Sequence, residues 1–122
     1  MRIDRSVGKK TTTLKWQHLG EKKSIRFSGR VEAEYSESKE LIVAAGTDGV
    51  IHLIKPDGTV VSEFSFDVSE SCNFYVLTKS TLTDLGVAIV MAHDPEYKGE
   101  RFWQHGIEIQ SQQISGPLSK WR

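Results

Sequence analysis

Two short glycine-containing turns divide residues 41–66 into three apolar runs, and this stretch constrains the fold more than any other part of the chain. The sequence reads LIVAAGTDGVIHLIKPDGTVVSEFSF. Glycine after aspartate supplies the positive φ that a tight hairpin turn needs, and proline sets φ at the second position of a turn. We therefore predict an antiparallel meander with strands at residues 41–46, 50–55 and 59–66.

The middle run of this meander is apolar on both of its faces. In a strand, Val50, His52 and Ile54 would share one face, and Ile51 and Leu53 the other, because successive side chains alternate. A strand that is apolar on both sides is typical of a position covered by protein on both sides.

Other β-branched or alternating runs predict further strands, and no segment keeps a helical period over three turns. In Phe102–Gln110, for example, Trp103 and His105 fall on one face and Gln104 on the other. Residues 24–35 read as one long strand bent at a glycine, and residues 94–100 as a polar loop that proline keeps out of a central strand. The further strands are expected at residues 11–17, 24–35, 72–79, 87–93 and 102–110.

The fold predicted from these patterns is an all-β, mainly antiparallel single domain spanning residues 1–122. It would be a β-meander of propeller-blade-like or sandwich-like form. The length fits one domain, and residues 1–10 are expected to form a flexible N-terminal arm.

The strand that ends in Ala45-Gly46, the Thr47-Asp48-Gly49 turn, the Pro56–Thr59 turn and the aromatic-ended strand Val60–Phe66 form a recognisable series. This series resembles one blade of a quinoprotein-like or WD-type β-propeller. The usual terminal tryptophan of such a blade is replaced by Phe64 and Phe66. Propellers use at least four blades of about 40 residues, so a closed monomeric propeller is not expected and the quinone or metal chemistry of that family is not carried over.

The neutral net charge of the chain hides a division between its two parts. Residues 1–30 contain nine basic and two acidic residues, a net charge of +7, whereas residues 31–122 contain seven basic and fourteen acidic residues, a net charge of −7. Cys72 is the only cysteine, which fits a reducing, cytoplasmic location and excludes a multi-cysteine zinc site. The apolar runs are far shorter than the roughly 20 residues that span a bilayer, so no membrane association is expected.

No catalytic template is present in the sequence. It contains no G-x-S-x-G elbow and no glycine-rich phosphate loop, so neither catalytic residues nor a cofactor are predicted. We predict a non-catalytic protein-binding domain, and a small cytosolic, immunity-type inhibitor of a basic enzyme is one form of it. An exposed aromatic cluster beside a flexible acidic loop is expected to bind the partner. Its residues are Glu96, Tyr97, Glu100, Phe102 and Trp103.

Two alternatives stay open at this point. The protein could be a metal-dependent enzyme or module, with His93, Asp94 and His105 converging as its metal site on neighbouring strands. The basic N-terminal third could bind a nucleic acid, although its Trp16 and Phe27 are expected to face the core and the total charge is zero. The residues of this second alternative are Lys9, Lys10, Lys22, Lys23, Arg26 and Arg30. Open sheet edges would also permit pairing between copies of the chain, so a homo-oligomer is a further option.

Overall fold

A computed structural model describes the whole chain, residues 1–122, as eleven antiparallel strands without a helix. The strands are β1 (Asp4–Val7), β2 (Thr11–His18), β3 (Glu21–Ser28), β4 (Val31–Ser36), β5 (Leu41–Gly46), β6 (Val50–Ile54), β7 (Val60–Ser65), β8 (Cys72–Lys79), β9 (Val87–Tyr97), β10 (Glu100–Glu108) and β11 (Gln113–Lys120). The prediction of an all-β, mainly antiparallel fold is confirmed. A helix with the length and hydropathy to cross a membrane is not found.

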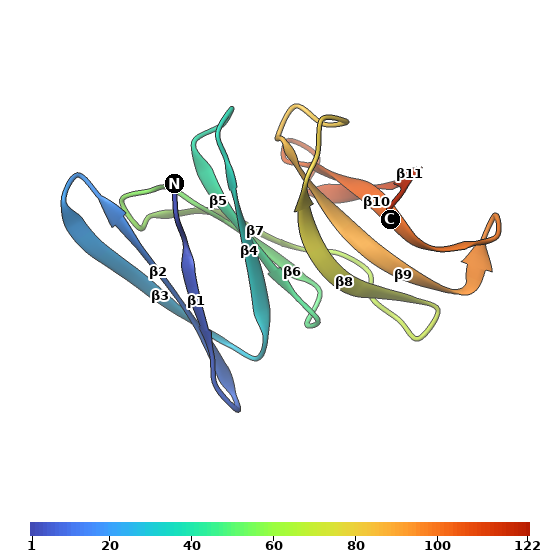
Figure 1. The fold of residues 1–122 in the computed structure, drawn as a ribbon, viewed down its shortest axis with the longest axis horizontal. Helices are drawn as coiled ribbons and strands as arrows, with labels where there is room; N and C mark the ends of the chain where they lie inside the picture. The colour runs from blue at the N-terminus through green and yellow to red at the C-terminus, as the bar shows by residue number, and fades with distance from the viewer.

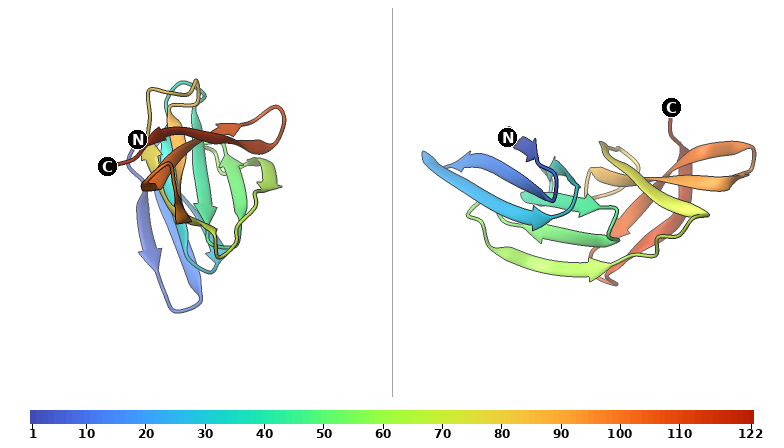
Figure 2. Two further views of the ribbon diagram at one scale, coloured as in Figure 1. Left: turned by 90° about the vertical axis from the view of Figure 1, so that its right-hand side faces the viewer. Right: turned by 90° about the horizontal axis from the view of Figure 1, so that it is seen from below.

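The strands form three sheets, and within each sheet the strand order follows the chain order. We call them the N-terminal sheet (β1–β3), the central sheet (β4–β7) and the C-terminal sheet (β8–β11). Figure 1 shows the central sheet between the other two, and the view from below in Figure 2 shows the sheets in a curved row. The N-terminal and C-terminal sheets lie at opposite ends of this row, so the blade-like meanders do not close into a ring.

The meander predicted at residues 41–66 is present as β5, β6 and β7. Gly49 and Gly58 have φ of +77° and +97°, as the two hairpin turns require. The carboxylate of Asp57 accepts a hydrogen bond of 2.8 Å from the backbone N–H of Thr59, and Asp48 accepts one of 3.2 Å from Val50 in the other turn. These local bonds fix the turns that the Asp-Gly pairs indicated.

The central sheet is buried on both faces, as the sequence of its middle strand predicted. On one face Leu53 belongs to an apolar cluster that includes Met91 of the C-terminal sheet. On the other face Ile54 belongs to a second cluster with Leu14 and Trp16 of the N-terminal sheet. Because burial of one such side chain stabilises the fold by about 1.5–3 kcal/mol, both apolar layers hold the three sheets together.

The long strand expected at residues 24–35 is in fact two strands, β3 and β4, that belong to different sheets. Gly29 lies between them with φ of +77°. The hydroxyl of Thr12, which is fully buried, donates to the carbonyl of Gly29 at 2.7 Å and accepts from the N–H of Val31 at 3.1 Å. The glycine therefore carries the chain from one sheet to the next instead of bending one strand.

Three other segments also differ from expectation. Residues 4–7 of the expected arm pair with β2 as an edge strand, Asp4 opposite Lys15. The expected loop at residues 94–100 is mostly strand, since β9 continues through Pro95 to Tyr97 and a short turn leads to β10. Residues 113–120, for which no strand was expected, form the edge strand β11.

Candidate functional site

The two faces of the C-terminal sheet have different surroundings. Met91 faces the central sheet, and Trp103 lies opposite it in the register of β9 and β10. Phe102 lies opposite Ala92 and therefore points away from the central sheet, because neighbouring residues in a strand alternate. We call these the inner face and the outer face of the C-terminal sheet.

Three aromatic rings cluster on the outer face. The ring of Phe102 lies 4.5 Å from the ring of Tyr75 and 6.2 Å from that of Trp121, and Tyr75 and Trp121 are 5.7 Å apart, measured between centroids. Tyr75 is 48% exposed, and Phe102 and Trp121 are partly exposed. Val90 lies on the same face and is fully buried, although it belongs to neither of the clusters between the sheets. We call Tyr75, Phe102 and Trp121 the aromatic cluster.

A pocket of about 640 Å³ continues the outer face at the other end of β10, beside the loop between β8 and β9. Leu82 and Leu118 line this pocket and are 52% and 48% exposed. Gly106 forms part of its floor: a Cβ there would lie 3.3 Å from Leu118 and 3.5 Å from Thr83. The outer face thus carries apolar side chains at both ends.

The five residues predicted to bind a partner do not form one surface cluster. Phe102 belongs to the outer face, whereas Trp103 is only 7% exposed on the inner face, so its expected exposure is wrong. The indole N–H of Trp103 donates to the carbonyls of Tyr97 and Glu100, at 3.1 and 3.0 Å. Consecutive residues of one strand point to opposite faces, so Phe102 and Trp103 cannot line one patch.

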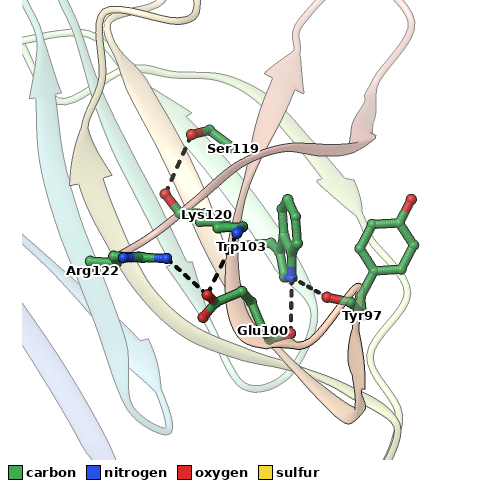
Figure 3. A network of polar contacts seen from close by, with 6 residues as sticks. All are labelled: Tyr97, Glu100, Trp103, Ser119, Lys120 and Arg122. Carbon is green, nitrogen blue, oxygen red and sulfur yellow. Dashed lines mark hydrogen bonds and ion pairs between the residues drawn. The ribbon is translucent and has the colours of Figure 1, made fainter.

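The expected acidic loop is largely neutralised by nearby cations. Figure 3 shows the carboxylate of Glu100 with Arg122 at 2.9 Å and Lys120 at 3.6 Å. Glu96 is exposed. The guanidinium of Arg101 lies over the ring of Phe102, 5.6 Å from its centroid. This end of the C-terminal sheet therefore has three carboxylates and four cations. The carboxylates are Asp94, Glu96 and Glu100, and the cations are Lys98, Arg101, Lys120 and Arg122.

His93 and His105, two residues of the metal-site alternative, do lie together. Their Nε2 atoms are 3.0 Å apart, and the two rings are nearly parallel, with an interplanar angle of 11°. Asp94, the third residue of that alternative, is exposed and follows His93 in the strand, so it lies on the opposite face. The thiol of Cys72 takes its place, with Sγ 3.9 Å from Nε2 of His93.

Burial determines the protonation states of His93, His105 and Cys72. It lowers the pKa of both histidines, and in His105 a bond to the carbonyl of Ser115 partly opposes this effect. Burial also raises the pKa of the Cys72 thiol. At neutral pH the two imidazoles and the thiol are therefore uncharged. A pocket of about 350 Å³, bordered by Asp67 and Ser69, reaches Cys72 and His105.

The basic residues of the nucleic-acid alternative are spread over several surfaces. Lys22 and Arg26 are exposed on the free face of β3, while Lys23 points the other way and pairs with Glu21 at 3.1 Å. The remaining residues, Lys9, Lys10 and Arg30, lie in the turns next to β2 and β4. Trp16 is 4% exposed. Proteins that bind single-stranded nucleic acids stack the bases on aromatic rings. This basic region presents no exposed aromatic ring for such stacking.

Comparison of the chain with protein-family models, with curated proteins and with solved structures gives no match.

Proposed function

We propose that this protein is a non-catalytic protein-binding domain that takes its partner on the outer face of the C-terminal sheet. The observation that carries the proposal is the aromatic cluster of Tyr75, Phe102 and Trp121, in which three exposed or partly exposed rings gather on a sheet face and belong to neither apolar cluster between the sheets. Both faces of the central sheet, by contrast, are covered by protein.

The composition of this face matches what protein interfaces use for affinity. Tyrosine, tryptophan and arginine are enriched among the residues that contribute most to binding, and they act best around a centre from which water is excluded. The cluster supplies a tyrosine and a tryptophan, and Arg101 lies against the ring of Phe102. The pocket beside Leu82 and Leu118 offers a second anchor point for an apolar side chain of the partner.

The charges near the cluster do not favour a basic partner over an acidic one, because four cations lie beside three carboxylates. The proposal therefore rests on apolar contact and not on charge. An immunity-type inhibitor of a basic enzyme in the cytoplasm is a narrower form of it. That form is supported only by the chain length and by the acidic excess in residues 31–122.

The test compares three forms of the full chain as bait in extracts of the native source. The double variant Tyr75→Ser/Trp121→Ser removes two rings of the cluster. The control Leu19→Ser removes an apolar side chain that is 89% exposed in the turn between β2 and β3. Circular dichroism first establishes that all three forms are folded.

We expect a protein that the unmodified chain and the Leu19→Ser variant retain in equal amounts and the double variant loses. Its affinity for the double variant, measured with the purified partner, should fall at least about 30-fold, since removal of one such anchor costs 2 kcal/mol or more. A partner retained equally by all three forms, or the absence of any stoichiometric partner, would contradict the proposal.

A further inference from the structure

Three potential metal ligands from three neighbouring strands converge on the inner face of the C-terminal sheet. Cys72 begins β8, His93 lies opposite it in β9, and His105 belongs to β10. One donor atom from each residue lies within 4.8 Å of the other two. The group is on the side of the sheet away from the aromatic cluster, so it is independent of the proposed partner surface.

Two of the three distances between these atoms are close to those of a tetrahedral zinc site. Zinc bonds of about 2.0–2.1 Å to nitrogen and 2.3 Å to sulfur at tetrahedral angles place two nitrogens about 3.3 Å apart, and nitrogen and sulfur about 3.6 Å apart. The two Nε2 atoms are 3.0 Å apart, and Sγ of Cys72 is 3.9 Å from Nε2 of His93. The third pair, Sγ of Cys72 and the ring nitrogen of His105, lies within 4.8 Å, so zinc binding requires the Cys72 side chain to move toward His105.

His105 is held in the tautomer that a metal needs. Its Nδ1–H donates to the carbonyl of Ser115 at 2.8 Å, so in the neutral ring Nε2 carries the free lone pair and points toward His93. A hydrogen bond from the second ring nitrogen to a carbonyl is the usual outer-shell support of a metal-bound histidine. Because this ring is 5% exposed, the surrounding protein keeps its orientation.

We propose that Cys72, His93 and His105 form a zinc site that leaves the fourth ligand position open toward the adjoining pocket. Two imidazoles and one thiolate suit Zn²⁺, whereas Mg²⁺ and Ca²⁺ require oxygen ligands. Three protein ligands with an open fourth position are typical of zinc that binds water or a further small ligand, and structural zinc usually has four protein ligands. The pocket of about 350 Å³ beside Cys72 and His105 provides the space.

Zinc binding would release one proton. Without the metal, the free lone pair of His105 accepts a hydrogen bond from Nε2–H of His93, which accounts for the 3.0 Å separation. On binding, the proton of His93 moves to Nδ1, so the ring stays neutral and its Nε2 binds the metal. The thiol of Cys72 loses its proton to solvent and binds as thiolate.

The test uses the full chain without an affinity tag, reduced and freed of metal. Zn²⁺ is titrated by calorimetry in two buffers with different ionisation enthalpies, and Co²⁺ is titrated by absorption spectroscopy. We expect one Zn²⁺ per chain, about one proton released and a thiolate-to-cobalt charge-transfer band. The variants are Cys72→Ser and His93→Gln, both at partly exposed positions, and the control is His18→Gln in β2.

Each of the two site variants should lose at least about 100-fold in zinc affinity, because outer-shell partners alone contribute roughly 10–100-fold. Cys72→Ser should also lose the charge-transfer band, while the control keeps both affinity and band. The proposal is overturned if no single site is saturated, or if Cys72→Ser binds zinc as tightly as His18→Gln. Neither result bears on the partner surface, which shares no residue with this site.

Discussion

At the scale of single residues, Thr12 shows how one side chain determines where a strand ends. It is fully buried and bonds both the carbonyl of Gly29 and the N–H of Val31, where the chain passes between sheets. The substitution Thr12→Val keeps the shape and leaves both backbone groups without a partner. We expect the free energy of unfolding to fall by about 1–3 kcal/mol, measured by urea denaturation.

The matched control is Thr13→Val, the next residue of the same strand, which points to the opposite face. It makes no comparable bond, so its effect should stay within about 0.5 kcal/mol. Equal losses for the two threonine variants would show that the bonds of Thr12 do not hold the N-terminal sheet to the central sheet.

Among Cys72, His93 and His105, the sequence predicted the two histidines as neighbours but not the cysteine. His93 and His105 were expected on neighbouring strands, but a regular hairpin that pairs Lys79 with Val87 would place Cys72 opposite Asp94. The register shifts between Phe74 and Val76, and this bulge brings Cys72 opposite His93 instead. A one-residue shift exchanges the faces of a strand, and composition does not indicate where such a shift occurs.

At the scale of elements, the Asp57 carboxylate in the turn between β6 and β7 contributes to the free energy of unfolding. The bond from the N–H of Thr59 is the main cause that lowers the pKa of Asp57 below its usual value. The pKa of Asp57 is thus lower in the folded protein than in the unfolded chain. The ionised carboxylate therefore stabilises the turn at pH values above the unfolded pKa, and this stabilisation is lost as the pH falls through the folded pKa. We expect Asp57→Asn to remove this contribution, so urea denaturation should show that its unfolding free energy falls less with acidification than that of the unmodified chain. Parallel curves below pH 5 would contradict this role.

The elements marked by Asp-Gly turns were predicted within a residue or two, while those interrupted by proline were not. Pro95 lies near the end of β9, beyond His93, the last residue of that strand that pairs with β8. Pro117 lies opposite His105 in the edge strand β11, at a shift of register. A proline costs least at an edge or a bulge, and the sequence alone does not show which strands will be edges.

At the scale of the whole molecule, the fold is an open row of three sheets with unlike ends. The double burial of β6 was predicted from its residues, but the sheets that cover it are formed by distant strands that no local pattern identifies. The N-terminal end of the row carries exposed Lys22 and Arg26, and the C-terminal end carries the aromatic cluster. This difference is the basis for assigning partner binding to the C-terminal end.

Hydroxyl-radical footprinting with mass spectrometry tests this assignment most directly, because the three tryptophans report on three environments. In the free protein we predict strong modification of Trp121 and Tyr75 and weak modification of Trp16 and Trp103, which are 4% and 7% exposed. In the complex with the captured partner, the modification of Trp121 and Tyr75 should fall at least several-fold. Modification of Trp103 as strong as that of Trp121, or no protection of Tyr75 and Trp121 in the complex, would contradict the account.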